Sequence, residues 1–511
     1  MWITLLSLAS LLLLYCWYFF CYAPYRVLKR LGITHPPVRP FMGNALQVLK
    51  LGYNDLLTKW INENGKVFGY YIGAKVHIVV ADLDILKVIT VKESDKFIDT
   101  DKEPDVMNQV RKNIKLGSGL VFEKDEEWKR VRRIVSPTFS IKKLKQMMPL
   151  VERNCDILNT VFDGISNTGQ SVNIHKIFGQ FSLQTMLAVA FGSEVNLLKG
   201  EGSLLTDAAA GFFGSLSDSF FTWENIFSSH FPILMKYASV MVAKYVPLAS
   251  HMKNINDASM EILKSRREQV ESGSEKLKDF IQLLMDARAD ESSDEESSNK
   301  ENMLNDLQIA GVCFDFMVGG YETTANALAC TSYLLSLNPD EQERLCEAID
   351  NYYQENEDAS LYDASQNIPY LDWVIQEALC MHPAASYRPR LCNETCTING
   401  VTFLKGAKVM IPIQYLHYSP EHWEEPDAFK PSRFSPEGKE GRNPLSHIPF
   451  GWGPRSCIGM RFALMEAKAC LVSILRKYRF ERSPDTQIPL MKKQGLTQSP
   501  KDGIFLRIIK A

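Results

Sequence analysis

The sequence predicts a mainly α-helical protein with smaller β-sheets, preceded by one membrane-spanning helix. Helical periodicity dominates the chain and is clearest in five stretches: 141–162, 258–271, 304–337, 339–353 and 370–381. Strand-like patterns predict two hairpins, at 66–80 around Gly73 and at 396–402, where Asn399-Gly400 is the preferred pair for a two-residue type I′ turn. An uncharged apolar segment at the N-terminus supplies the membrane helix.

The N-terminal segment has the length and composition of a signal anchor. Residues 2–23 carry no charge, and at about 1.5 Å per residue they can span a hydrocarbon core of about 30 Å. A cleavable signal peptide would have a basic start and a shorter apolar run ending in small residues. Arg26, Lys29 and Arg30 follow directly, so the positive-inside rule places the rest of the chain in the cytosol. We expect an anchor over residues 1–25 and a basic, proline-rich connector over 26–45.

Composition and charge exclude few classes of protein. With 57 basic and 60 acidic residues the net charge is −3, so no overall positive charge favours nucleic acid. The 11 cysteines follow no paired framework, and their odd number favours a reducing compartment. The acidic, serine-rich run at 290–299 predicts a solvated loop.

The segment Phe450–Gly459 has the composition of a thiolate site. Cys457 lies between glycines, Arg455 stands two residues before it, and a helical pattern follows it. A helix N-terminus supplies the positive potential that a thiolate needs. Gly453 and Gly459 would permit close backbone approach and conformations that other residues disfavour. A buried cysteine in a glycine-rich turn is the alternative for a lone cysteine, whereas zinc is disfavoured because no other Cys or His lies two to five residues away.

This string resembles the cysteine-ligand loop of the cytochrome P-450 superfamily, whose thiolate binds a haem iron. Three further strings resemble motifs of that superfamily in the same order: Trp128-Lys-Arg-Val-Arg132, Gly319-Gly-Tyr-Glu-Thr-Thr324 and Phe429-Lys-Pro-Ser-Arg-Phe434. The resemblance covers about residues 35–511 and implies one haem domain over 46–511 with the cytochrome P-450 fold. Other local strings are similar to the microsomal branch that contains the vertebrate family 3 enzymes and thromboxane synthase.

The resemblance implies a set of site residues around haem b. Cys457 would ligate the iron, Thr323 would be the oxygen-activating alcohol, and Glu322 would relay protons. The residues expected to contact haem are Trp128, Arg132, Arg390, Phe450, Arg455 and Gly459. The expected pocket residues are Phe314, Phe316, Ala384 and Ala385, although a core position is equally open for the two phenylalanines. The 107–120 loop and the aromatics Phe212, Phe213, Phe220 and Phe221 match variable substrate-contact segments, or pack the core or the membrane-facing surface.

Two consecutive glycines stand in the middle of a predicted helix. Each costs about 1 kcal/mol relative to alanine, so Gly319-Gly320 indicates a kink or a close backbone neighbour. The resemblance adds a third explanation, in which a widened turn leaves room for dioxygen above the iron.

One family motif is broken in this chain. The superfamily's E-x-x-R reads Glu377-Ala-Leu-Cys380, so the arginine that would join Glu377 and Arg433 is missing. Removing one partner of a buried ion pair typically costs about 3–5 kcal/mol. We expect Glu377 to pair with Arg433. A compensated natural variant, a haem-deficient relative and a single-base change in this copy of the sequence all remain open.

The resemblance implies a monooxygenase that inserts one oxygen atom from O2 into an apolar lipid, steroid or xenobiotic. No flavin or nicotinamide motif occurs, so electrons would come from an NADPH-dependent flavoprotein reductase, with cytochrome b5 as a further donor. A basic docking face is predicted from these residues: Lys129, Arg130, Arg133, Lys142, Lys143 and Lys145. The expected location is the endoplasmic reticulum membrane, with the catalytic domain in the cytosol.

Two other functions stay open. A reductase-independent isomerase of fatty-acid peroxides, similar to thromboxane synthase, is disfavoured by the pair Thr323-Thr324, because peroxide rearrangement needs no oxygen-activating alcohol. A catalytically impaired haem-binding relative is suggested only by Cys380.

Overall fold

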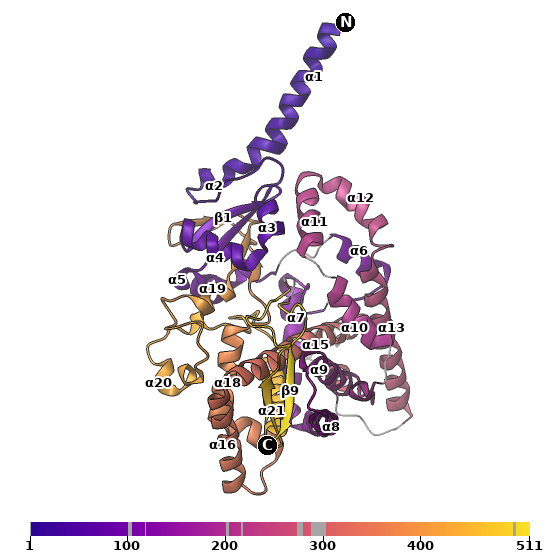
Figure 1. The fold of residues 1–511 in the computed structure, drawn as a ribbon. Helices are drawn as coiled ribbons and strands as arrows, with labels where there is room; N and C mark the ends of the chain where they lie inside the picture. Colours follow the sequence, from indigo (N-terminus) through magenta and orange to yellow (C-terminus); the bar gives the residue numbers. More distant parts are fainter. Residues whose placement is uncertain are drawn as a thin grey trace.

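The structure is a computed structural model. It describes residues 2–100, 105–117, 119–200, 204–215, 218–272, 279–287, 303–493 and 497–511. Figure 1 shows a helical body from which the N-terminal helix projects. The acidic run at 290–299 lies outside the described residues.

The projecting helix is long and apolar enough to cross a membrane. A helical segment of 29 residues runs from Trp2 to Arg30 and contains α1 (Trp2–Trp17), a π turn, a 3-10 turn and α2 (Val27–Arg30). Its apolar window is not buried against the body. These properties agree with an anchor, while the boundaries at 25 and 45 stay a prediction.

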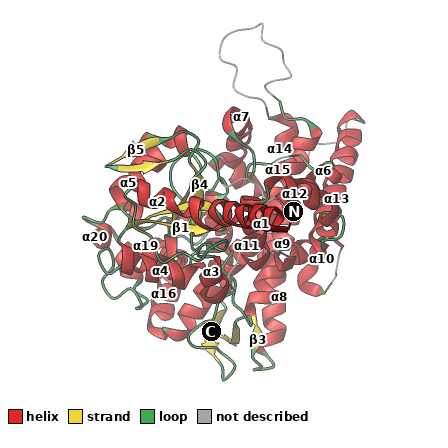
Figure 2. Cartoon of the chain, turned by 90° about the horizontal axis from the view of Figure 1, so that it is seen from above, coloured by secondary structure: helices red, strands yellow, loops and turns green. Residues whose placement is uncertain are grey.

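Helices make up most of the body (Figure 2). The helices of eight residues or more after the anchor are α4 (Tyr53–Asn64), α6 (Asp105–Asn113), α7 (Asp125–Val135), α8 (Ile141–Ser166), α9 (Ile174–Phe191), α10 (Leu204–Ser215), α11 (Asp218–His230), α12 (Pro232–Val242), α13 (Pro247–Glu271), α15 (Asp306–Leu337), α16 (Pro339–Glu355), α18 (Pro369–Met381) and α21 (Met460–Leu475). The shorter ones are α3 (Ala45–Leu51), α5 (Leu83–Lys87), α14 (Phe280–Asp286), α17 (Leu361–Asn367), α19 (Ile413–Tyr418) and α20 (Pro436–Lys439).

All five predicted long helices are confirmed, with corrections to their ends. The main one concerns α13, which begins at Pro247 instead of at residue 258, because a proline fits the first turn of a helix. The segment 107–120, expected as a loop, contains most of α6.

The strands form one four-stranded sheet and two smaller sheets. The larger sheet has the order β1 (Val67–Ile72), β2 (Lys75–Val80), β7 (Lys408–Ile411) and β4 (Arg388–Leu391), with β2 parallel to β7. The smaller sheets are β3 (Val172–Asn173), β9 (Phe505–Lys510) and β8 (Tyr478–Arg482), and the hairpin β5 (Cys396–Ile398) and β6 (Val401–Phe403). Both predicted hairpins are confirmed, and Asn399 and Gly400 have φ angles of 47° and 81°, as a type I′ turn requires.

Helix α15 lies in the middle of the body (Figure 1). It begins with a capping box between Asn305 and Gln308 and ends at Leu337, ahead of Pro339. It packs against α9, α13, α18 and α21. The larger hydrophobic core surrounds this helix, and a second core lies with the four-stranded sheet. The centre of α15 is therefore held from several sides.

Candidate functional site

The Cys457 loop is held by its backbone. The N–H of Cys457 donates to the carbonyl oxygen of Phe450 at 2.8 Å. Gly453 has a φ of 76°, and a Cβ at that position would overlap the carbonyl oxygen of Thr90. Gly459 was expected to need a special conformation too, but its φ is −84°, so that expectation is wrong. A Cβ there would have no protein atom nearer than 3.9 Å.

The Cys457 side chain is accessible although protein surrounds it. The residue is exposed by surface area, yet desolvation by the surrounding protein raises the pKa of its thiol, which Arg388, Arg132 and the N–H groups of Gly459 and Met460 lower again. Exposure together with desolvation indicates space inside the protein instead of an outer surface. Because the pKa is raised overall, a bound metal ion is the partner that would make this thiol a thiolate.

Arg455 ties the cysteine loop to the segment before α7. Its Nε–H donates to the Ile98 oxygen at 2.7 Å, and its Nη groups donate to the oxygens of Leu120 at 2.9 Å and Glu123 at 2.6 Å. The guanidinium also stacks on Trp128, with 3.9 Å to the ring centroid. Most N–H donors of Arg455 are therefore engaged by oxygens of the protein. Fewer donors remain for a haem propionate than the motif suggests.

Two other predicted arginines lie nearby. Arg132 donates from Nη2 to the Ser456 oxygen at 3.0 Å. Arg390 is 6% exposed, and its Nη1 donates to the Pro389 oxygen at 3.0 Å. Desolvation and Arg388 lower the pKa of Arg390 to about 10, and desolvation is the main cause that lowers the pKa of Arg455 to about 9. The structure thus brings Arg132, Arg390 and Arg455 together with Cys457.

These residues fit the haem that the sequence predicts. The cavity contains a thiol that can ligate iron, and Gly459 leaves free space beside it. Of the carboxylates in the part of the chain that the structure describes, Asp99 is the ion-pair partner within this arginine cluster, 3.5 Å from Arg455. Haem carries two propionates, which an excess of guanidinium groups would bind.

The centre of α15 contributes Thr323 but no widened turn. The helix is α-helical throughout, so the expected widening is absent. The Thr323 hydroxyl donates to the Gly319 oxygen. Gly319 is exposed and a Cβ there would meet no protein atom within 4 Å, whereas a Cβ on Gly320 would lie 2.5 Å from Met186 Sδ. Gly320 therefore has a close neighbour, but it is the side chain of Met186 and not the backbone that was expected, while Gly319 and Thr323 share a face that borders free space.

Glu322 is held by the C-terminal segment, which sequence reasoning missed. Thr497 Oγ1 donates to Glu322 Oε2 at 2.6 Å, and Ser499 Oγ donates to Oε1 at 2.8 Å. Between them, the Gln498 N–H donates to the Ala384 oxygen at 2.8 Å. The predicted proton relay and the predicted pocket wall are thereby joined by three consecutive residues. Nothing in the sequence around Thr497 and Ser499 indicates this contact.

The predicted pocket residues separate into two groups. Phe314 stacks edge-on against Phe212 at 5.4 Å and stays a candidate for the pocket wall. Phe316 packs against Phe139 at 5.0 Å and Phe280 at 5.1 Å, which favours the core alternative for Phe316. Residues two apart on a helix do not share a face, which explains the difference. Ala384 is half-buried and Ala385 buried. The side chains of Phe220 and Phe221 lie outside the described part of the structure.

Glu377 and Arg433 form the expected pair, although Cys380 replaces the family arginine. Arg433 Nε donates to Glu377 Oε1 at 3.1 Å, and the Lys430 N–H donates to the same oxygen at 2.9 Å. Among the described residues Glu377 Oε2 has no hydrogen-bond partner. Burial raises the pKa of Glu377 to about 7, against the effects of Lys430, Arg433 and Arg442. Cys380 is buried and its thiol donates to the His417 oxygen at 3.6 Å.

Arg442 supplies a second cation near Glu377, a contact that sequence reasoning missed. Its guanidinium stacks on Trp423 at 4.3 Å and on Phe434 at 5.1 Å, and donates to the oxygens of Arg433 and Gly438. Trp423 and Phe434 form a small cluster with Cys380. Aromatic rings therefore pack beside Cys380, and Arg442 adds a positive charge near Glu377 from another segment.

Two members of the predicted docking face form ion pairs within the protein. Arg130 pairs with Glu127 at 2.7 Å and donates to Gln308, so it fixes α7 to α15. Lys129 pairs with Asp95 and Glu126. The remaining members are Arg133, Lys142, Lys143 and Lys145.

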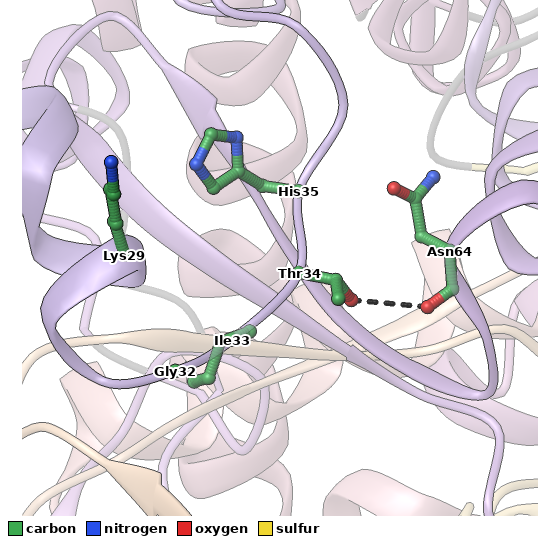
Figure 3. A pocket seen from close by; sticks show the side chains of 6 residues that line it. All are labelled: Lys29, Gly32, Ile33, Thr34, His35 and Asn64. Carbon is green, nitrogen blue, oxygen red and sulfur yellow. Dashed lines mark hydrogen bonds between the residues drawn. The ribbon is translucent and has the colours of Figure 1, made fainter.

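A surface hollow lies on the connector and contains none of the predicted site residues. Its lining residues are Lys29, Gly32, Ile33, Thr34, His35 and Asn64 (Figure 3). The Thr34 hydroxyl donates to the Asn64 oxygen at 3.0 Å. The hollow is open and its lining is polar at several points. It lies at the junction between the anchor and the body.

Comparison with known proteins agrees with this site. A profile of the family described as Cytochrome P450 matches residues 34–507. Cytochrome P450 3A5 of Homo sapiens is 33% identical over 507 residues, which cover 99% of this chain and 96% of the relative. Cytochrome P450 3A6 of Oryctolagus cuniculus is 32% identical, covering 98% and 95%, and thromboxane-A synthase of Sus scrofa is 28% identical, covering 99% and 97%. The match spans the cysteine loop, the arginine cluster and the centre of α15, and the chain belongs to the cytochrome P450 family.

Proposed function

We propose that this protein is a membrane-anchored haem-thiolate monooxygenase that inserts one atom of O2 into an apolar small molecule. The observation that carries the proposal is the accessible thiol of Cys457 near Arg132 and Arg388, in a part of the chain where protein desolvates it. Proteins of this family are monooxygenases that bind haem b. When bound, haem supplies the oxygen activation that the side chains of a protein cannot supply.

Each predicted residue then has a defined task. Cys457 would ligate the iron, and the propionates would lie with Trp128, Arg132, Arg390 and Arg455. Phe450 and Gly459 would flank the ring. Thr323 Oγ1 would hold a proton on the substrate side of α15, and Glu322 would pass protons to it from water, positioned by its two hydroxyl donors.

We infer that electrons arrive from a partner protein. An NADPH-dependent flavoprotein reductase is the proposed donor and cytochrome b5 a further one. Arg133, Lys142, Lys143 and Lys145 would meet an acidic surface, and such steering weakens as ionic strength rises.

We infer that the protein is a single-pass protein of the endoplasmic reticulum membrane, with an anchor over 1–25, a connector over 26–45 and a haem domain over 46–511. Helix α12 supports this arrangement, because it lies on the side of the body from which α1 projects (Figure 1). Its side chains Ile233, Leu234, Tyr237 and Met241 are exposed. Exposed apolar side chains of this kind mark membrane or protein contacts.

An isomerase of fatty-acid peroxides is the second candidate, because thromboxane-A synthase is among the relatives. Peroxide rearrangement needs no proton relay, so the hydrogen bonds that hold Glu322 favour the monooxygenase. Turnover of O2 that requires a reductase supports the first function, and turnover of a fatty-acid peroxide without any reductase supports the second.

The carbon monoxide difference spectrum of the reduced, purified protein tests the proposal. We expect the thiolate-type band in the parent and its loss in Cys457→Ala. The matched control is Cys470→Ala, which removes a buried cysteine from α21 and should keep the band. A thiolate-type band in Cys457→Ala, or no band in the parent, would overturn the proposal.

A further inference from the structure

Asn326 is a buried amide on α15 for which the proposed function has no task. It lies one turn after Glu322, is 2% exposed, and its Oδ1 accepts from Nε2 of His175 on α9 at 2.8 Å. Burial lowers the pKa of His175, so its ring is neutral at neutral pH and the proton on Nε2 is the one that it donates. Among the described residues Asn326 Nδ2 has no hydrogen-bond partner. A buried amide N–H group without a partner is costly, and water is the usual partner where protein provides none.

Contacts among three segments close a ring around this amide. Ser499 Oγ on the C-terminal segment donates to Glu322 Oε1 at 2.8 Å, and the Lys493 N–H donates to the Ser499 oxygen at 2.7 Å. Lys493 is in turn an electrostatic neighbour of His175, which is bonded to Asn326. Because Glu322 and Asn326 stand four residues apart on α15, both side chains lie on one face of the helix. Helix α15, α9 and the C-terminal segment therefore meet at this face.

Backbone contacts fix the first turn of α9 beside the C-terminal segment. The Ile174 N–H donates to the Ile504 oxygen at 2.8 Å, and β3 pairs with β9 through Asn173 and Phe505. His175 directly follows these residues of α9 and β3. Its place next to α15 therefore rests on main-chain geometry as well as on its own hydrogen bond.

The gap between Asn326 and Glu322 suits one water molecule. Residues four apart on a helix have Cβ atoms about 5–6 Å apart, which is close enough for a single water to bridge the two side chains. Each Glu322 oxygen accepts one hydroxyl hydrogen and keeps a lone pair for a further donor. A water at this place accepts from Asn326 Nδ2 and donates to Glu322, which meets the minimum number of polar partners that a buried water needs.

We propose that Asn326 is a positioning residue that holds a water molecule against Glu322, and that His175 fixes the orientation of Asn326. The amide itself keeps its protons. The water gives a proton to Glu322 and takes one from the next water, so one O–H bond forms for each that breaks. This assignment rests on the proposed function, in which Glu322 passes protons to Thr323, and it identifies the residues that hold the water from which the proton comes.

Electron use by the haem-loaded, full-length protein with an NADPH-dependent flavoprotein reductase tests the proton path. The measured quantities are the rate of NADPH consumption and the share of its electrons that leaves as hydrogen peroxide. In Asn326→Leu we expect this share to rise and the rest of NADPH consumption to slow about 10-fold, a part of the roughly 100- to 10,000-fold that a positioned proton-transfer group contributes. Asn326→Ser keeps a hydroxyl donor for the water and should retain most of the parent's rate.

Thr331→Val is the matched control on the same helix. The Thr331 side chain is buried, and its hydroxyl donates to the Ala327 oxygen of α15 at 2.7 Å. We expect this variant to change neither the rate nor the peroxide share. An effect equal to that of Asn326→Leu would show that any buried polar side chain of α15 has the same influence, which would overturn the inference.

A second readout does not depend on activity. The midpoint of thermal unfolding, followed by far-ultraviolet circular dichroism, is compared for Asn326→Leu, Glu322→Ala and the double variant. A shared water makes the two shifts non-additive, whereas the shifts of Thr331→Val and Glu322→Ala should add. Additive shifts for Asn326 and Glu322 would contradict a water held between them.

The variants separate the holding of a water from a merely structural role. An unchanged peroxide share in Asn326→Leu would overturn the inference, and so would an equal loss of rate in Asn326→Ser. If Asn326→Leu does not fold, His175→Gln and His175→Phe take its place, because only glutamine keeps a donor for Asn326 Oδ1. Equal behaviour of these two variants would contradict the assignment. Absence of the thiolate-type band in the parent would instead refute the proposed function, while the unfolding cycle would still test the water contact.

Discussion

Residue 380 shows how one missing side chain is compensated. Cys380 leaves Glu377 Oε2 without a hydrogen bond among the described residues, while Arg442 lies over the neighbouring rings of Trp423 and Phe434. Two hydrogen bonds keep Glu377 in place although the family's triad is reduced to a pair, and the charge of Arg442 adds to them. The geometry favours a compensated natural variant over a haem-deficient relative.

Arg442→Ala tests this compensation at the residue scale. The substitution should lower stability by about 1–3 kcal/mol, because it removes a stacked cation and its hydrogen bonds. Cys380→Arg should raise stability by about 1–3 kcal/mol, and it should do so more strongly in the Arg442→Ala background, since neighbouring changes are not additive. Thermal loss of the Soret absorbance of the four proteins measures this. Equal effects of Cys380→Arg in both backgrounds would show that Arg442 does not replace the missing arginine.

The titration of Glu377 gives a second residue-scale prediction. Its pKa is raised from 4.5 to about 7. Between these values the unfolded chain releases the proton while the folded protein keeps it, so the contribution of Glu377 to stability is present at low pH and falls as pH rises. Relative to Glu377→Gln, the parent should lose up to about 3 kcal/mol from acidic to mildly alkaline pH. Melting curves of both proteins across that range measure the difference, and a constant difference would contradict the raised pKa.

At the scale of elements, adjacent glycines of α15 have different neighbours. Gly319→Ala should stabilise the protein by about 1 kcal/mol, since the added Cβ meets no protein atom within 4 Å and alanine favours the helix. Gly320→Ala should gain less stability than Gly319→Ala, because the added Cβ requires the buried end of the Met186 side chain to move. Thermal unfolding of both variants and the carbon monoxide spectrum provide the comparison. A stability order opposite to this one would show that α15 is placed differently against α9.

Local patterns predicted the elements well and the contacts between them poorly. The helices and both hairpins follow from periodicity and from Asn399-Gly400, because these signals lie within a few residues. The cysteine loop was predicted from a single sequence motif, Phe450–Gly459. The contact of Thr497 and Ser499 with Glu322 joins segments about 175 residues apart in sequence, and nothing near either end indicates it. The assignment of Phe316 to the core likewise depends on Phe280, which approaches only in the folded chain.

At the scale of the whole molecule, the anchor and the body are separable. Deleting residues 1–23 should leave haem incorporation intact, because the apolar window of the anchor is not buried and the deleted segment contacts the body at its end, where Phe20 lies against His230 and Phe231. Membrane attachment should weaken but persist through α12, and polar substitutions of Leu234 and Tyr237 should remove the remainder, since both are exposed. Flotation with phospholipid vesicles and the Soret absorbance measure the two properties separately. Loss of haem on truncation would show that the anchor is part of the folding unit.

The parallel pairing of β2 with β7 has a consequence for synthesis of the chain. Strand β2 ends at Val80, whereas its partner begins at Lys408, so the first strands leave the ribosome long before the sheet can be completed. At about 5–20 residues per second, this delay is on the order of half a minute. During that time one edge of β2 stays unpaired and can bind other strands. The four-stranded sheet should therefore be completed only after β7 has been synthesised.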